Sequence, residues 1–296
     1  MERMVKGLHK VVNHLVLILL VAAALLALFL VADSDRYFSS AAHEEYAAFD
    51  PGSNDTGFRQ LQSKNPDVFA WLELYGTAIN FPVAQHPEDN SYYINHDATG
   101  ASSSTGSIFL DVYSSKDFTD FNSLVYGHYM EEHAMFGDLK LFQNTDFFKT
   151  HEYGRLYASG RTYGLQTLAF LKVSAADDLV YTPHIANEQK AAYLSHLSDF
   201  TLLQREEPTT SDRLLLLSSC AYDVSGGRFV LLCRLLEEVP ENPFGESGES
   251  PTRQKILKRL EALSGVKLAG ILLVLIILTG AVYRYSTRRR GPETTA

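Results

Sequence analysis

The two cysteines of the chain, Cys220 and Cys233, stand in neighbouring apolar runs that are separated by a polar connection. Cys220 ends a run of leucines and serines, while Arg228 opens the second run and Cys233 lies inside it. A thiol at the end of a strand can face a cleft and act as a nucleophile once it is deprotonated. A guanidinium beside it favours the thiolate and can donate hydrogen bonds to a developing oxyanion. These residue types therefore indicate cysteine-based acyl chemistry.

The runs 213–218 and 228–236 are predicted to pair as an antiparallel hairpin, because the connection between them contains an aspartate and two glycines. In such a hairpin Cys220 and Arg228 flank the connecting loop and lie close together. The two-residue alternation of a strand puts Cys233 on the face opposite to Arg228. We therefore expect Cys233 to be a buried structural thiol. Free cysteines are usually buried and inert, so the role of Cys220 depends on a base near it.

The best candidate for that base among the ten histidines is His128. It follows the short apolar run 123–126 and a glycine, again at a predicted strand end. A histidine titrates near neutral pH and can accept and return a proton during catalysis. His96, between Asn95 and Asp97, is a second candidate. The remaining histidines lie close to apolar terminal segments or in polar surroundings, where surface histidines are common.

The order His128, Cys220, Arg228 resembles that of the sortases, and four local strings resemble the class B branch of this family. The resemblance spans about residues 71–236. The strings, in chain order, are Asp89-Asn90-Ser91-Tyr92-Tyr93, Gly106-Ser107-Ile108-Phe109-Leu110-Asp111, Tyr126-Gly127-His128-Tyr129-Met130 and Met135-Phe136-Gly137-Asp138-Leu139.

The chain departs from the family pattern at two places. The usual Thr-Leu-x-Thr-Cys signature reads Leu216-Leu217-Ser218-Ser219-Cys220 here. Serine keeps the hydroxyl group, so we expect the chemistry to survive while the substrate fit shifts. Pilus-building sortases of class C carry an Asp-Pro-aromatic lid, whereas Asp50-Pro51 is followed by Gly52, and we interpret this string as a turn.

The resemblance implies a cysteine transpeptidase that cleaves a C-terminal sorting motif of secreted proteins and joins the new carboxyl end to an amine. It implies that Cys220 is the nucleophile of a thioacyl intermediate and that His128 is the general acid and then the general base. Arg228 would orient the substrate and stabilise the oxyanion. No metal or organic cofactor is implied. The implied substrate-contacting residues are Asn90, Tyr126, Ser218 and Ser219, which match by position, together with Tyr181 and Thr182, which lie in a segment that resembles a groove wall of the family.

The acceptor and two rival functions stay open at this stage. The amine is either that of a lipid-linked peptidoglycan precursor, which gives wall anchoring, or a pilin lysine, which gives a polymer. One rival is a secreted cysteine hydrolase that uses the same residues and releases its product to water. The other rival is a membrane-tethered assembly or binding module without catalysis, in which Cys220 is structural.

The elements that must position these residues are mostly short β-type runs between turn residues. They predict a mainly β fold, either a β-barrel or a sandwich, with short helices inserted at 139–142 and 187–200. The resemblance to the sortases implies an eight-stranded sortase-type barrel over residues 70–238. A further short helix is expected before Asn65, in an extracellular helical segment 33–69. The eight runs are 70–74, 78–83, 107–110, 123–126, 154–158, 164–173, 213–218 and 228–236.

Two apolar segments flank this domain. Residues 11–32 carry no Lys, Arg, Asp or Glu and are long enough to cross a bilayer as a signal anchor, although a cleavable signal peptide is the alternative. Residues 266–285 form the second predicted transmembrane helix, and a second membrane segment at the C-terminus resembles the pilus-building sortases. Basic residues in the segments 1–10 and 286–296 predict that both termini are cytoplasmic and that the barrel lies outside the cell membrane. Residues 239–265 read as a linker and a juxtamembrane helix.

Charge and cysteine content exclude other classes. The chain has a net charge of −9, and residues 33–265 carry 18 Lys plus Arg against 33 Asp plus Glu. Such an acidic domain excludes nucleic acid as the expected partner, because phosphate binding needs a basic surface. The two cysteines form no CxxC pair, so no zinc-thiolate site is expected. The expected partners are the membrane bilayer, sorting-motif proteins and an amine acceptor.

Overall fold

The computed structural model divides the chain into two compact units, Met1–Tyr37 with Pro251–Ala296, and Phe38–Ser250. The second unit carries the sheet. For Cys220 the backbone alone is described. The described residues are 46–52, 55–130, 133–220 and 226–245, with isolated positions between 7 and 29, Gly270 and Gly280.

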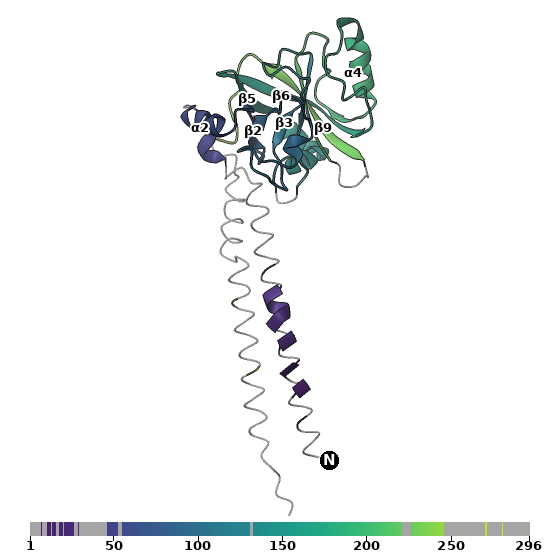
Figure 1. Ribbon diagram of the computed structural model, residues 1–296. Coiled ribbons are helices and arrows are strands. Elements are labelled where there is room, and N and C mark those ends of the chain that lie inside the picture. The colour runs from purple at the N-terminus through teal and green to yellow at the C-terminus, as the bar shows by residue number, and fades with distance from the viewer. Residues whose placement is uncertain are drawn as a thin grey trace, which may run out of the picture. The chain divides into compact units, whose positions relative to one another are not determined.

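The second unit is built on one sheet that closes on itself. Its strands follow the order β5-β1-β2-β3-β4-β8-β9-β6-β7, and an additional β5–β6 pairing closes a barrel of eight strands (Figure 1). The mainly β, eight-stranded barrel is therefore confirmed. The strands are β1 (Val68–Leu74), β2 (Asn80–Ala84), β3 (Ile108–Leu110), β4 (Asn122–Tyr126), β5 (Tyr153–Ala158), β6 (Arg161–Ser174), β7 (Thr201–Gln204), β8 (Leu214–Cys220) and β9 (Gly227–Leu236).

A ninth strand, β7, was not predicted. It pairs with β6 beyond the barrel, at Ala169–Leu171 of β6, and alternates between half-buried and exposed residues. Its sequence, Thr-Leu-Leu-Gln, is too short for a clear two-residue pattern. Only the pairing with β6 makes this segment a strand.

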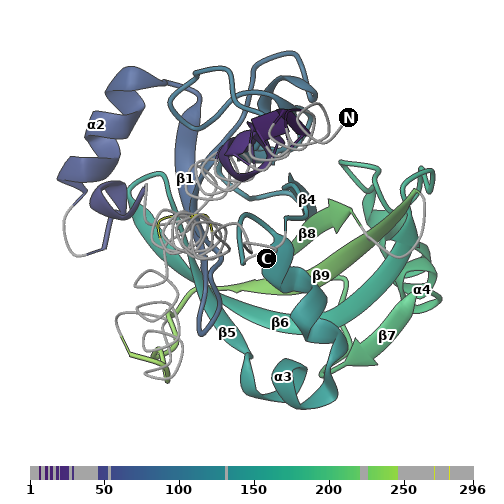
Figure 2. The ribbon, with the colours of Figure 1, turned by 90° about the horizontal axis from the view of Figure 1, so that it is seen from below.

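Of the three α-helices described in the second unit, α2 precedes β1 and the other two lie between strands, and one of them was not predicted. They are α2 (Thr56–Lys64), α3 (Thr145–Thr150) and α4 (Lys190–Ser198), and the predicted helix at 139–142 is the centre of a 3-10 segment, Gly137–Gln143. The helix that was not predicted is α3, and its start is marked by Asn144, whose side chain accepts hydrogen bonds from the backbone N–H groups of Asp146 and Phe147. α2 and α4 lie on opposite sides of the barrel in both views (Figures 1 and 2).

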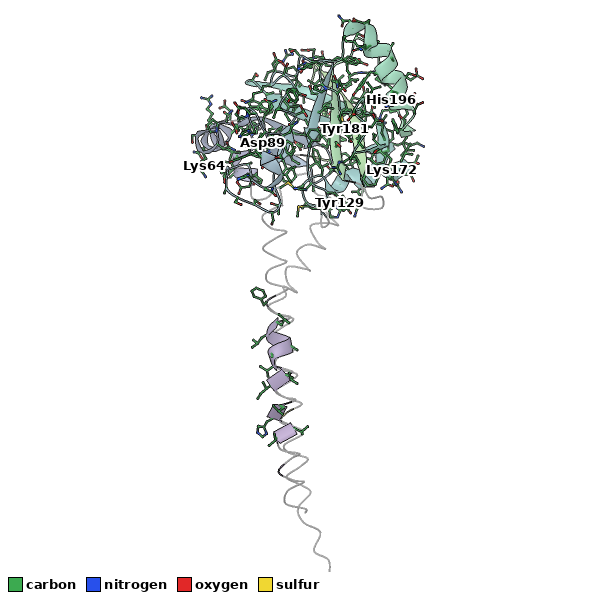
Figure 3. The ribbon with its side chains drawn as sticks, turned by 45° about the vertical axis from the view of Figure 1, so that its right-hand side comes forward. Lys64, Asp89, Tyr129, Lys172, Tyr181 and His196 are labelled. Atoms are coloured by element: carbon green, nitrogen blue, oxygen red, sulfur yellow. The ribbon has the colours of Figure 1, made fainter. Side chains whose placement is uncertain are left out.

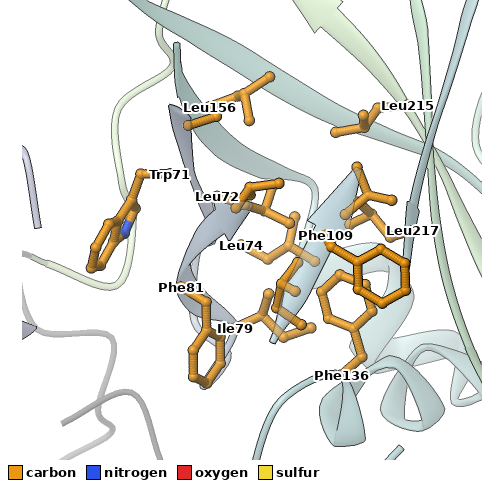
Figure 4. Close-up of a cluster of buried hydrophobic side chains, with 14 of the residues drawn as sticks. Trp71, Leu72, Leu74, Ile79, Phe81, Phe109, Phe136, Leu156, Leu215 and Leu217 are labelled. Carbon is orange, nitrogen blue, oxygen red and sulfur yellow. The ribbon is translucent and has the colours of Figure 1, made fainter. Parts of the chain in front are cut away.

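Two buried clusters explain the sequence of β8. One cluster fills the barrel with side chains from all eight strands, among them Leu72, Phe109, Leu156 and Leu215 (Figure 4). The second covers the outer face of β4, β6, β8 and β9 and includes Tyr193 of α4. Because β8 is buried on both faces, its sequence is a continuous leucine run rather than an alternation.

The ends of the unit are tied to the barrel. Asp50 accepts two hydrogen bonds from Arg155 of β5 at 2.9 Å, and its Oδ1 accepts one from the backbone N–H of Gly52. The described part of the Asp50-Pro51 string is thus a turn that is fastened to the barrel. Toward the C-terminal side, Phe244 stacks on His151 with ring centroids 4.7 Å apart, so the described part of the predicted linker contacts the barrel through Phe244.

The predicted membrane segments, the segment 33–45 and the tail 286–296 lie largely or wholly outside the described residues, and so does the juxtamembrane helix expected at 254–263. Within the part of the chain that is described, no helix combines the length and the apolar character needed to cross a membrane.

Candidate active site

The hairpin of β8 and β9 brings Cys220 and Arg228 together, as predicted. The two strands pair in antiparallel register from Leu214 opposite Arg234 to Cys220 opposite Arg228, and β8 and β9 run side by side in Figure 2. Arg228 is half-buried. The connecting residues 221–225 lie outside the described residues.

The other neighbour of β8 is β4, the strand that precedes His128 in the chain. β4 and β8 are parallel, with Tyr126 opposite Ser218, and the N–H of Gly127 donates to the carbonyl of Ser218 at 3.1 Å. His128 follows Tyr126 by two residues, as Cys220 follows Ser218. β4 ends at Tyr126, so the last paired positions of β4 and β8 lie two residues before His128 and Cys220, respectively.

The ring of His128 is oriented by a carbonyl group. Its Nε2 lies 2.9 Å from the carbonyl oxygen of Ile94. A carbonyl oxygen only accepts, so Nε2 carries the hydrogen, and Nδ1 is left as the nitrogen that exchanges protons in neutral histidine. Gly106, at φ +63°, makes room for this arrangement, because a Cβ there would lie 2.7 Å from the Ile94 oxygen and 3.0 Å from the His128 ring.

Two of the predicted substrate-contacting residues meet at a carboxylate that the sequence analysis did not single out. Asn90 Nδ2 donates to Asp111 Oδ2 at 2.7 Å, and the Tyr126 hydroxyl donates to the same oxygen at 3.2 Å. Burial, and then the charge of Asp111, raises the pKa of Tyr126, so the phenol stays protonated. Asp111 belongs to a quoted family string, which was the available signal for it.

Three further predicted residues gather around the end of β8. The hydroxyl groups of Tyr181 and Ser218 are 3.1 Å apart, and the rings of Tyr181 and Tyr126 lie 6.2 Å apart, centroid to centroid. Ser219 is buried, and its hydroxyl has no hydrogen-bond partner among the described residues. Tyr126, Tyr181 and Ser218 thus form one polar group next to Cys220 in the register.

Thr182, the last predicted residue, bonds away from this group. Its hydroxyl donates to the carbonyl of Asp178 at 2.5 Å, and its own carbonyl accepts from Asn122 at 2.8 Å. The loop that carries Tyr181 and Thr182 is also held by hydrogen bonding between Nε2 of His196, on α4, and the carboxylate of Asp177 at 3.0 Å. Tyr181 and His196 are labelled in Figure 3. Asn122 and the His196–Asp177 contact were missed, because no local signal in the sequence links them to the loop.

The alternative residues are used for packing. His96 stacks on Tyr92 with centroids 3.9 Å apart, and its Nδ1 bonds the Tyr92 carbonyl at 2.8 Å, so its role is structural. Cys233 is fully buried, and burial raises the pKa of its thiol far above its usual range. Among the described residues, no group of three or more His, Cys, Asp or Glu is arranged to hold a metal ion.

The comparisons agree on one group of relatives. No family model matches the chain. It is 30% identical to the sortase B of Listeria monocytogenes over 60% of this chain and 73% of that protein, and 26% identical to the sortase B of Staphylococcus aureus over 61% and 75%. Among solved structures, the sortase B from the type II pilus of Streptococcus pneumoniae is 37% identical, with a TM-score of 0.53, over 62% of this chain and 100% of that one.

A Streptococcus pyogenes class B sortase involved in pilus biogenesis is 31% identical, with a TM-score of 0.56, over 61% of this chain and 98% of that one. A Staphylococcus aureus sortase B–substrate complex is 25% identical, with the same TM-score, over 66% and 88%.

Proposed function

Because the chain belongs to the class B sortases, which are cysteine transpeptidases, we propose that it cleaves a C-terminal sorting motif of secreted proteins and transfers the acyl group to an amine. One observation supports the assignment of the catalytic residues: β9 pairs Arg228 with Cys220, and β4, the other neighbour of β8, ends two residues before His128. These are the residue types that acyl transfer through a thioester needs.

In the proposed reaction the Cys220 thiolate attacks the scissile carbonyl carbon and forms a tetrahedral oxyanion. Collapse of this intermediate breaks the C–N bond, and the protonated His128 gives its Nδ1 proton to the leaving amine. The thioacyl intermediate is then attacked by the acceptor amine, which loses a proton to His128 as the thiolate leaves. The hydrogen bond from Nε2 to the Ile94 carbonyl keeps the ring orientation through both steps.

Arg228 acts on the oxyanion and on the thiolate. Its position opposite Cys220 puts a cation beside the group whose charge changes during the reaction. A fixed donor aimed at a developing oxyanion contributes more than it does in water, because it needs no reorganisation when the charge forms.

The sorting motif binds along Asn90 and the polar group of Tyr126, Tyr181 and Ser218. A substrate complex exists for the Staphylococcus aureus relative, which supports a peptide ligand for the same fold. Thr182 contributes to the groove through its loop, since its hydroxyl is bonded to Asp178.

We assign the acceptor to a lysine amine of a pilus subunit rather than to a wall precursor. Two solved relatives, at 37% and 31% identity, are named as pilus sortases. The second predicted membrane segment favours the same choice, since it resembles the pilus-building enzymes.

We also propose that the chain is a two-pass membrane protein with the barrel outside the cell. The apolar, uncharged segments and their basic flanks support this topology. Protease treatment of intact cells tests it: the barrel should be digested, whereas tags on both termini should stay protected. Protection of the barrel would contradict this topology.

The activity is tested with the full chain in mild detergent, a panel of sorting-motif peptides and either a glycine peptide or a lysine-containing pilin peptide. Mass spectrometry should find a ligated product, and that product should be absent for Cys220→Ala. The matched control is Cys233→Ala, which removes the buried thiol and should keep the product.

The outcomes separate the alternatives. Ligation to the lysine peptide supports the pilus assignment, and ligation to glycine alone supports wall anchoring. Hydrolysis without ligation supports the hydrolase. A product that persists in Cys220→Ala would contradict the assigned nucleophile.

A further inference from the structure

We propose that Asp111 is a positioning residue that sets the hydrogen-bonding polarity of the substrate groove by fixing the side chains of Asn90 and Tyr126. This inference rests on the proposed function. It adds a residue to the site and specifies which group of the substrate backbone each side of the groove binds.

Asp111 is a buried carboxylate that is stabilised by neutral donors. Its residue is 4% exposed, and it directly follows β3. Oδ2 accepts hydrogen bonds from Asn90 and Tyr126, and Oδ1 accepts one from the backbone N–H of Tyr113 at 2.9 Å. Among the described residues, no lysine or arginine forms an ion pair with it. A buried charge of this kind is costly unless such donors surround it.

The carboxylate decides which way the Asn90 amide points. Asn90 Oδ1 accepts from the backbone N–H of Val112 at 2.8 Å, and Nδ2 gives one hydrogen to Asp111. A carboxylate only accepts, so the amide cannot turn over without losing both bonds. The second Nδ2 hydrogen is then the group that half-buried Asn90 offers to a ligand, and Asn90 acts as a donor.

The same carboxylate makes Tyr126 an acceptor. The single hydrogen of the Tyr126 hydroxyl is given to Asp111 Oδ2, so the phenol oxygen offers its lone pairs to the groove. Removal of the negative charge of Asp111 would free this hydroxyl to rotate and to act as a donor.

A donor and an acceptor held by one oxygen fit one residue of an extended peptide. The two groups lie within about 6 Å of each other, because both are hydrogen-bonded to the same atom. In an extended strand, the N–H and C=O of one residue point to the same side. The Asn90 amide therefore receives the substrate C=O, and the Tyr126 oxygen receives the N–H, whatever side chain that residue carries.

The test uses substrate peptides in which one backbone amide at a time is replaced by an ester, which removes a single N–H. With the wild-type full chain, the ester at one position of the peptide should lower kcat/KM about 10-fold, because the hydrogen bond from that N–H to the Tyr126 oxygen is lost. In the Asp111→Asn variant, kcat/KM for the parent peptide should fall about 10- to 100-fold. The ester at the same position should then lower kcat/KM by less than about 3-fold relative to the parent peptide.

Two variants separate this role from a structural one. Asp138→Asn alters another buried carboxylate, bonded to the N–H of Ala78 and to His133, and should keep the ester profile of the wild type. Tyr126→Phe keeps the ring and removes the acceptor, so the ester effect should disappear even if Asp111→Asn folds poorly.

The inference is overturned if the wild-type chain turns over the peptide while Asp111→Asn or Tyr126→Phe keeps the full ester effect. Absence of wild-type turnover with every peptide would instead contradict the proposed function itself. The rate at which a small thiol reagent alkylates Cys220 should be unchanged in Asp111→Asn, since Asp111 acts on the groove and not on the thiol.

Discussion

The β9 strand carries two arginines, Arg228 and Arg234, on the same face. They lie at opposite ends of its pairing with β8. Arg234 lies opposite Leu214, forms ion pairs with Asp212 and Glu206, each at 2.9 Å, and donates a hydrogen bond to Gln166 at 3.1 Å. Arg228 lies opposite Cys220, where β8 ends next to the turn. The residue type is identical and the strand is shared. The neighbouring strands and loops decide that one arginine serves stability and the other, in our proposal, serves chemistry.

The largest expected effect is that of Arg228→Ala. We expect kcat/KM for peptide ligation to fall about 100- to 1000-fold, because a donor to the oxyanion is lost. The free energy of unfolding should change little, since strand pairing uses the backbone. The rate of Cys220 acylation in a single turnover measures the effect on the step in which the oxyanion forms. An equal loss in Arg234→Ala would break the comparison, because it would show that both arginines act through the fold.

The next effect is on stability. Arg234→Ala should lower the free energy of unfolding by about 1–3 kcal/mol, because it leaves the half-buried Asp212 without its cation. Urea denaturation measures this change, and kcat of the folded fraction should remain close to that of the wild type. A stable variant with impaired acylation would place Arg234 in the catalytic machinery.

The smallest effect extends the comparison to the two cysteines. Cys233→Ala should cost about 1 kcal/mol through lost packing in the barrel and should keep ligation activity. The raised pKa of the Cys233 thiol keeps it protonated and unreactive in the folded state. Alkylation should therefore label one cysteine per native chain and two after denaturation. Labelling of both thiols in the native protein would contradict the burial of Cys233.

Much of the fold was predictable because it follows from local pattern. The eight predicted β runs all correspond to strands of the barrel, and the helix expected at 187–200 contains α4. The exceptions are short. β7 depends on its partner β6, and α3 is a six-residue helix whose only local signal is its Asn144 cap. In both cases tertiary contacts outweigh intrinsic preference.

By itself, the sequence determined which residues can do chemistry and that two of them are neighbours. Cys220 and Arg228 are joined by a short connection, so a local hairpin brings them together whatever the rest of the chain does. Only the tertiary structure decided the remaining relations. His128 follows β4, which pairs in parallel with the Cys220 strand although the two strands are far apart in the chain, and Asp111 joins Asn90 to Tyr126. Such contacts form only when the barrel closes, because closing long loops costs entropy that the packed core must offset.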